Sequence, residues 1–181
     1  MPDLEAARRF LQDSDLIVGA AAVDAAIERV AAEVTAACAK DYPLLLTVMG
    51  GAVVFAGRLL PLLRFPLDID YLHATRYGDA TRGAGIEWRV APPPAARGRD
   101  VIVLDDILDA GHTLRAICDR LREVGAARVR CAVLVEKILP VAKPIQADFV
   151  GLRIPDRFVF GCGMDAKGYW RNLPEIRAIK E

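Results

Sequence analysis

Hydrophobic residues recur along this chain with two alternating periods. Between residues 20 and 39 the apolar positions fall three and four apart in an alanine-rich stretch, which predicts an amphipathic helix. Residues 101–104 form a short apolar run, followed by a helical stripe from Leu114 to Val124 and a second apolar run at 129–135. Strand, helix and strand at this spacing predict a right-handed parallel unit, and therefore a parallel sheet flanked by helices.

Three more strands are predicted outside this unit. The run at 44–49 reads as a buried strand closed by two glycines, and residues 67–73 and 86–90 alternate as half-buried strands do. In the first of these two, Leu67, Ile69 and Tyr71 are expected to form the buried face. Residues 76–85 between the two strands are polar and glycine-rich. They are predicted to form either a lid that covers a site or an ordinary hairpin connection.

Ligands of parallel sheets bind beyond the carboxyl ends of the strands. This rule points to four places: residues 49–51, the turn that starts at Asp105, the pair 136–137, and the segment that follows 148–152. The candidate chemistry of the chain is therefore expected at these positions.

Composition narrows the function classes. The 181 residues carry 24 basic and 24 acidic side chains and are 54% hydrophobic, which indicates one globular domain and argues against nucleic-acid binding driven by counterion release. The amino-terminal residues are charged throughout and the apolar runs are short, so we expect a cytoplasmic protein without a signal peptide or membrane anchor. Its four cysteines form no C-x-x-C pair, which favours reduced thiols over a zinc site or disulfides.

The strongest signal is the string VIVLDDILDAGHTL at 101–114. Small residues at the start of a helix let backbone amides close around an anion, and the helix dipole adds positive charge. Asp105 and Asp106 precede this cradle, where the vicinal hydroxyls of a ribose bridged to Mg²⁺ would accept carboxylates. A ribose 5-phosphate fits both halves of the motif. The candidate phosphate-binding residues are Ala110, Gly111, His112 and Thr113.

Three other interpretations of the acids remain open from the residues alone. Acidic residues at a strand end also occur in phosphoaspartate receivers and in hydrolases with an aspartate nucleophile, and Asp105 and Asp106 are also candidates for a helix N-cap.

The whole string resembles the 5-phosphoribosyl-1-pyrophosphate motif of the type I phosphoribosyltransferases. From about residue 44 to 175 the chain is similar to their purine-salvage branch, the hypoxanthine-guanine phosphoribosyltransferases. The resemblance implies a twisted parallel sheet flanked by helices, with a small hood built from the two ends of the chain. It places the core at about 44–150, the hood at about 1–20 and 151–181, and a mobile lid at about 76–85.

The resemblance also assigns the residues that would hold the donor. Gly50 and Gly51 would bind pyrophosphate through their amides, Arg171 would contact it, and Tyr77 would close over the site as part of the lid. Two positions depart from the family pattern: Met49 stands where a basic residue is common, and Arg76 precedes Tyr77 in place of serine.

For the base, the same resemblance implies that Lys137 donates to O6 of a 6-oxopurine, Phe158 stacks on the ring and Val159 contacts its edge. Asp165 would serve a second metal ion and the pyrimidine edge. Asp109, expected one helical turn beyond the metal- and ribose-binding Asp105 and Asp106, would be the catalytic residue that shares a proton with N7.

The resemblance thus implies Mg²⁺-dependent transfer of 5-phosphoribosyl to N9 of hypoxanthine or guanine, giving IMP or GMP and pyrophosphate, by a homodimer or homotetramer. A xanthine-preferring enzyme is one alternative. Another is a nucleotide-sensing RNA-binding regulator on the same fold, which would need a contiguous basic face. The arginines that cluster in the sequence are Arg115, Arg120, Arg122, Arg128 and Arg130.

Overall fold

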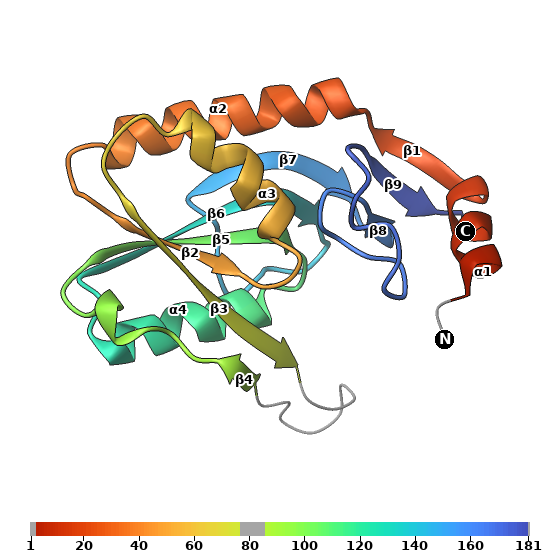
Figure 1. Cartoon of the computed structure of the whole chain (residues 1–181). Coiled ribbons are helices and arrows are strands. Elements are labelled where there is room, and N and C mark those ends of the chain that lie inside the picture. Colours follow the sequence, from red (N-terminus) through yellow and green to blue (C-terminus); the bar gives the residue numbers. More distant parts are fainter. Residues whose placement is uncertain (1–2, 77–85, 181) are drawn as a thin grey trace.

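Helices and strands alternate along most of the chain. The structure, a computed structural model, describes residues 3–76 and 86–180 (Figure 1). The helices described are α1 (Leu4–Gln12), α2 (Ala20–Cys38), α3 (Val53–Leu59) and α4 (His112–Val124), with single 3₁₀ turns η1 (Leu60–Leu62) and η2 (Pro94–Ala96). The strands described are β1 (Ser14–Val18), β2 (Leu44–Val48), β3 (Asp68–Arg76), β4 (Ile86–Val90), β5 (Asp100–Leu108), β6 (Arg128–Ile138), β7 (Phe149–Pro155), β8 (Val159–Phe160) and β9 (Ile176–Ile179).

A six-stranded sheet in the order β4-β3-β2-β5-β6-β7 forms the body of the molecule. Strands β3, β2, β5, β6 and β7 pair in parallel, and β4 pairs antiparallel to β3 at one edge. Helices α2 and α3 lie on one face of this sheet and α4 on the other (Figure 1). The predicted parallel sheet sandwiched by helices is confirmed.

The two ends of the chain build a second sheet. Strands β1, β9 and β8 pair antiparallel in that order, so residues 14–18 lie beside residues 176–179. Figure 1 shows this small sheet beyond the end of the main sheet toward which β2 and β5 point. The expected hood is therefore present. Its boundaries remain a prediction, and β7 continues the main sheet as far as Pro155.

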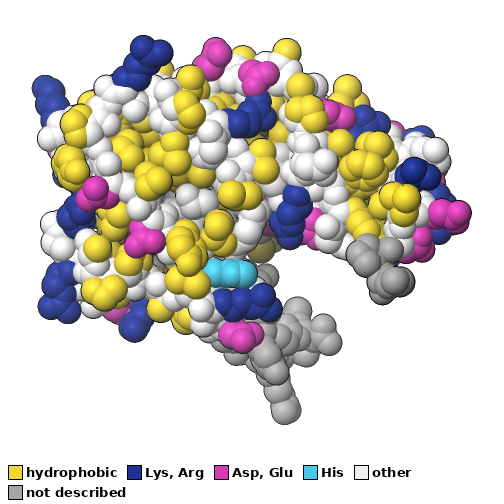
Figure 2. Space-filling model, viewed as in Figure 1, with side chains coloured by type: hydrophobic (Ala, Val, Ile, Leu, Met, Phe, Trp, Pro, Cys, Tyr) yellow, Lys and Arg dark blue, Asp and Glu magenta, His cyan; other side chains and the backbone are white. Residues whose placement is uncertain are grey.

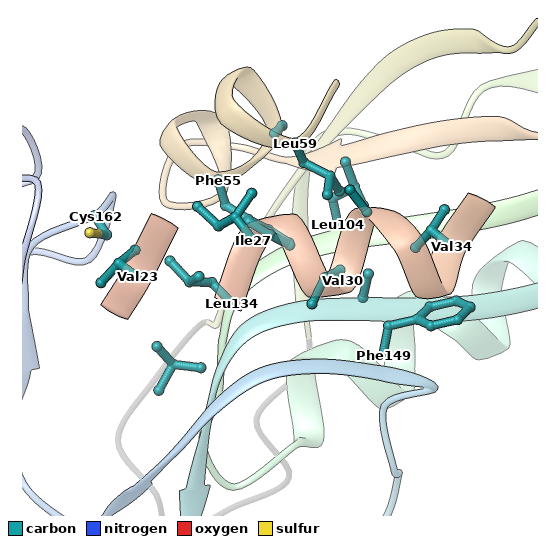
Figure 3. Packing of buried hydrophobic residues seen from close by; sticks show 14 of the residues in the cluster. Val23, Ile27, Val30, Val34, Phe55, Leu59, Leu104, Leu134, Phe149 and Cys162 are labelled. Atoms are coloured by element: carbon teal, nitrogen blue, oxygen red, sulfur yellow. The ribbon is translucent and has the colours of Figure 1, made fainter. Parts of the chain in front are cut away.

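The central strand β5 is buried on both faces. Ile102 and Leu104 belong to the core cluster under α2 and α3, and the alternate residues Val101 and Val103 belong to the cluster under α4. Figure 3 shows Ile27 and Val30 of α2 against the sheet and α3, in the first of these clusters. Burial on both faces explains the uninterrupted apolar run of this strand.

The strand β5 extends further than its apolar run predicts. Its backbone pairs with that of β6 as far as Leu108, opposite Glu136. The hydrogen-bond ladder thus continues beyond the apolar run, through the polar residues Asp105 and Asp106. Asp105 and Asp106 therefore lie inside the strand, and α4 begins only at His112. The expectation that Asp109 lies one helical turn beyond these acids is wrong, since Asp109 stands in the loop between β5 and α4.

The buried face of β3 also differs from the expectation. Ile69 and Tyr71 are 63% and 47% exposed, whereas Leu72 is fully buried in the cluster under α4. Helix α4 packs against β3 from the side of Leu72, while α2 and α3 cover strands further along the sheet. The face that carries Ile69 and Tyr71 is thus left at the surface.

In the described part of the chain, no helix combines the length and the apolar character that crossing a membrane requires.

Replacing Ile27 by alanine is expected to lower the free energy of unfolding by about 2–5 kcal/mol, because it leaves a cavity between α2 and the sheet. Urea denaturation followed by circular dichroism measures the change. Leu16→Ala, at a side chain that is 57% exposed on β1, is the control and should stay within about 0.5 kcal/mol. Equal losses in the two variants would contradict the packing of α2.

Candidate active site

Side chains from the ends of β5 and β6, from β8 and from the segments beside β8 line one cleft of about 200 Å³. Its walls are Asp106, Ile107, Asp109, Lys137, Phe158, Val159, Met164 and Asp165. Six of these eight residues are site candidates from the sequence. The fold therefore brings the residues expected around a purine and a metal into one place.

A smaller hollow of about 90 Å³ adjoins this cleft and shares Ile107 and Asp109 with it. It is lined by Asp105, Ile107, Leu108, Asp109, Ala110, Gly111, His112, Thr113 and Leu114. Helix α4 begins here, and its N-cap, Gly111, offers no side-chain cap to the first-turn amides. Free amides at the positive end of a helix suit a phosphate.

Gly111 is required by the geometry of this loop. Its φ of +83° lies in the left-handed region, and a β-carbon there would come within 3.3 Å of Ile145 and Leu108. The short loop between β5 and α4 can therefore make its turn only with a residue that lacks a side chain. Because the N-cap is Gly111, the helix-cap interpretation of Asp105 and Asp106 is excluded.

A second glycine brings the loop after β2 against the acids. A β-carbon on Gly51 would clash with Oδ2 of Asp106, so the backbone there touches the carboxylate. The carbonyl oxygen of Gly51 in turn lies where a β-carbon of Gly163 would stand. Gly50 has open space beside it, and the peptide bond that precedes it is cis. The two predicted pyrophosphate glycines thus lie next to the acidic end of β5.

Lys137 is held between two carboxylates. Its Nζ lies 3.2 Å from Oδ2 of Asp109 and 3.3 Å from Oδ1 of Asp156, and its side chain is only 11% exposed. Asp156 was not among the residues predicted for the site. The signal for it was present, since it follows the carboxyl end of β7, where the position rule points.

The aromatic and apolar walls differ in exposure. The Phe158 side chain is 56% exposed at the mouth of the cleft, whereas Val159 is 7% exposed in β8. An exposed ring beside a polar cleft is available to stack on a flat ligand.

Arg171 reaches the site through Asp165. Its guanidinium lies 2.5 Å from Oδ1 of Asp165 and donates to the carbonyl of Gly163 at 2.7 Å. Oδ2 of Asp165 also accepts from the amide of Gly168 at 2.6 Å. Gly163 adjoins Gly51, and the positive charge of Arg171 acts on the Asp106 carboxylate, whose pKa it lowers.

Burial dominates the electrostatics of the two adjacent acids. Burial, and after it the neighbouring Asp106, holds the pKa of the Asp105 carboxyl well above its usual range. Burial also raises the pKa of Asp106, while hydrogen bonds from its neighbours and the charge of Arg171 act in the opposite direction. A ligand that brings positive charge or hydrogen-bond donors to this pair would stabilise both carboxylates.

The arginines expected on a basic face are paired with acids. Asp119 pairs with Arg115 and Arg122 at 2.6 and 2.8 Å, and Glu123 pairs with Arg120 at 2.9 Å. Arg130 pairs with Asp100 at 2.7 Å, and Arg128 lies 3.6 Å from the same carboxylate. The cluster is therefore a set of ion pairs and not a contiguous cationic surface.

The predicted lid cannot be placed in this site. Tyr77 and the rest of residues 77–85 lie outside the described residues, and of Arg76 only the backbone at the end of β3 is described.

The fold and this edge of the sheet define a class of α/β protein in which a helix N-terminus without a side-chain cap stands beside an acidic, aromatic-walled cleft. Residues 17–167 match the phosphoribosyl transferase domain family. The chain is 31% identical over 156 residues to the hypoxanthine-guanine phosphoribosyltransferase of Bacillus subtilis, covering 85% of this chain and 86% of that protein.

Solved structures agree with the sequence relatives. A crystal structure of a hypoxanthine-guanine phosphoribosyltransferase from Bacillus anthracis superposes with a TM-score of 0.81 at 25% identity, over 92% of this chain and 98% of that one. A hypoxanthine-guanine-xanthine phosphoribosyltransferase superposes with a TM-score of 0.78 at 27% identity, over 94% of this chain and 97% of that one. The chain belongs to the phosphoribosyltransferase family.

Replacing Gly51 by alanine is expected to lower turnover on the order of 100-fold, because the new methyl group displaces the Asp106 carboxylate. Gly57→Ala is the matched control: it lies in α3 with open space around it and should keep turnover while stabilising the fold by about 0.5–1 kcal/mol. Steady-state assays and thermal unfolding of both variants measure the two effects. Full turnover in Gly51→Ala would remove this contact from the site.

Proposed function

We propose that this protein transfers 5-phosphoribosyl from its pyrophosphate donor to N9 of hypoxanthine or guanine, giving IMP or GMP and pyrophosphate in purine salvage. The observation that carries the proposal is the pairing of Lys137 with Asp109 at 3.2 Å in the cleft lined by Phe158, directly beside the hollow at the start of α4. The names of the relatives support the same reaction.

Lys137 selects the base. An ammonium has three donors and no acceptor, so it pairs with O6 of a 6-oxopurine and meets only another donor in adenine. Phe158 stacks on the ring, and the backbone of Val159 contacts its edge. Asp109 and Asp156 take two of the donors of Lys137, and because the side chain is only 11% exposed, a base that offers no acceptor to the third is rejected.

Asp109 is the proposed catalytic residue. As N9 forms its bond to C1′, the bond from C1′ to the pyrophosphate oxygen breaks and the proton on N7 passes to the Asp109 carboxylate. The ammonium of Lys137, 3.2 Å away, orients that carboxylate before the transfer. The proton therefore leaves the purine as its ring becomes positively charged.

The remaining site residues hold the donor. The amides and hydroxyl of Ala110, Gly111, His112 and Thr113 bind the 5-phosphate at the start of α4. The amides of Gly50 and Gly51 and the guanidinium of Arg171 stabilise the negative charge that develops on pyrophosphate. Tyr77, in the proposed lid, excludes water from the activated sugar.

The acids at the end of β5 suit a Mg²⁺ ion that is bound jointly by the protein and the substrate. Carboxylate oxygens suit this ion, which usually keeps several waters and is bound through one or two carboxylates together with substrate phosphates. Among residues 3–76 and 86–180 no cluster of three or more metal-ligating side chains stands ready, so the donor must complete the set. Asp105 and Asp106 are the proposed residues for one ion and Asp165 for a second, and bound Mg²⁺ would neutralise charge on the leaving pyrophosphate.

The partners proposed are small molecules and further copies of this chain, in the cytoplasm. The ion pairs around Arg115 to Arg130 speak against an RNA surface. Figure 2 shows hydrophobic side chains gathered on the face of β3 and α3, where Ile69, Tyr71 and Val53 are 63%, 47% and 48% exposed. An exposed apolar patch of this kind supports a homodimer or homotetramer.

A spectrophotometric assay of the purified protein with hypoxanthine, guanine, xanthine and adenine, each with the pyrophosphate donor and Mg²⁺, tests the proposal. We expect turnover of hypoxanthine and guanine that stops in excess chelator. Preference for xanthine would select the alternative base specificity, and absence of turnover with every 6-oxopurine would overturn the proposed function. Full activity in excess chelator would overturn the role of Mg²⁺.

Replacing Asp109 by asparagine is expected to lower turnover about 10²–10⁴-fold, the usual contribution of a positioned acid or base, while the affinity for ribose 5-phosphate stays unchanged. Asp119→Asn, on the exposed side of α4, is the control and should keep turnover. Single-turnover kinetics and calorimetry of ribose 5-phosphate measure the two quantities. An Asp109→Asn protein with normal turnover would exclude Asp109 from proton transfer.

Replacing Lys137 by glutamine is expected to erode the discrimination against adenine, which reaches roughly 10⁴–10⁵ in kcat/KM in well-made sites. The loss should fall on the 6-oxopurines, roughly 10–150-fold, the equivalent of a lost hydrogen bond to a charged group. Comparing kcat/KM for hypoxanthine and adenine in Lys137→Gln and in Lys40→Gln, an exposed control, measures it. A variant that keeps the full preference would mean that Lys137 does not select the base.

A further inference from the structure

Lys143 is a second partly buried cation at the same edge of the sheet. Its side chain is 10% exposed, and its Nζ lies 2.5 Å from the carbonyl oxygen of Lys137, 3.2 Å from that of Leu108 and 3.4 Å from Oε1 of Glu136. An ammonium has three hydrogens to donate, so these three acceptors satisfy it fully.

The acceptors belong to two neighbouring strands. The ladder between β5 and β6 has its last pair at Leu108 and Glu136, and Asp109 follows Leu108 directly. Lys143 donates to the carbonyl of Leu108 in this last pair and to that of Lys137, which directly follows Glu136. It therefore bridges the two strands at the point where one delivers Asp109 and the other delivers Lys137.

The segment that carries Lys143 is itself anchored on both sides. Glu136 also accepts from Nε of Arg153 at 3.0 Å, which ties the ion pair to β7. A β-carbon on Gly111 would lie 3.3 Å from Ile145 and 3.5 Å from Pro144, so the segment also touches the phosphate loop. Lys143 does not line the 200 Å³ cleft; it lines an adjoining hollow of about 450 Å³ that shares Lys137 with the cleft.

We propose that Lys143 is a positioning residue that sets the separation of Asp109 and Lys137 and thereby the affinity for the 6-oxopurine. The proposal rests on the proposed function, in which these two side chains meet the base. Removing the ammonium takes this shared donor away from the carbonyl groups of Leu108 and Lys137, while Glu136 keeps its pairing with Arg153. The ends of β5 and β6 are then free to shift relative to each other.

A positioning role and a merely structural role predict different patterns. General destabilisation would lower the affinity for every ligand alike. At a temperature where the protein is fully folded, it would lower none of these affinities. Displacement of Lys137 and Asp109 acts first on the base that these two side chains meet, whereas the amides of His112 and Thr113 stay in the first turn of α4. Comparison of a ligand that has a base with one that lacks it separates the two.

Calorimetry of wild type, Lys143→Met and the exposed control Lys40→Met with GMP, AMP and ribose 5-phosphate makes this comparison. We expect Lys143→Met to lower the affinity for GMP on the order of 10-fold or more, a size typical of a misplaced binding group. The affinity for ribose 5-phosphate should stay within about twofold of wild type. Lys40→Met should match wild type for all three ligands.

A chemical rescue provides the second arm. Lys143→Cys should lose affinity for GMP as Lys143→Met does, and alkylation with 2-bromoethylamine, which forms a thioether and releases bromide, should restore the ammonium and the affinity. The native cysteines Cys38, Cys118, Cys131 and Cys162 are all buried, whereas the new thiol would stand at the 450 Å³ hollow that Lys143 lines, where the reagent can enter. Mass spectrometry confirms a single modification.

Three results would each overturn the positioning role. They are an equal loss of affinity for GMP and for ribose 5-phosphate, an unchanged affinity for GMP in Lys143→Met, and no recovery of affinity after alkylation of Lys143→Cys. A wild-type protein that binds GMP no better than AMP would instead overturn the proposed function, and this inference with it. The two failures are thus distinguished by the protein in which they occur.

Discussion

The parallel pairing of β5 with β6 is the constraint on which the site depends. Because the strands run side by side in register to Leu108 and Glu136, the residues that follow them are delivered to one edge of the sheet. Asp109 and Lys137 are 28 positions apart in the chain and 3.2 Å apart in space for this reason. The burial of β5 on both faces, under α2 and under α4, fixes that edge in turn.

The same strand accommodates an electrostatic cost at its functional end. Asp105 is 8% exposed and lies next to Asp106, although burying a carboxylate beside another one is unfavourable. Both side chains line hollows that a ligand would fill. The acids are therefore better explained by what binds to them than by the stability of the empty fold, a trade between stability and activity that is common at such sites.

Much of this organisation could be predicted from the sequence, because it depends on local pattern. Three local patterns predict their elements. Helical spacing from Val23 to Cys38 predicts α2, the apolar run at 101–104 predicts the first part of β5, and the two glycines predict the turn after β2. The motif at 101–114 predicted the residues that line the 90 Å³ hollow at the start of α4. The resemblance to the family led to Lys137, Phe158 and Asp165, which line one cleft.

What could not be predicted depends on pairing between distant segments. Strand β5 continues through its acids because β6 lies beside it, and this changed the place of Asp109. The exposed face of β3 followed from which helix covers which strand. Asp156 and Lys143 are single charged residues in irregular segments, and only the folded chain shows that their partners are Lys137 and the carbonyl groups around it.

A crystal structure of the protein with bound GMP tests the combined site most directly. The phosphate should lie within hydrogen-bond distance of the amides of residues 110–113, with O6 of the base on Nζ of Lys137 and the ring on Phe158. Binding of the phosphate away from the start of α4, or of the base outside the cleft that Lys137 and Phe158 line, would contradict the proposed arrangement.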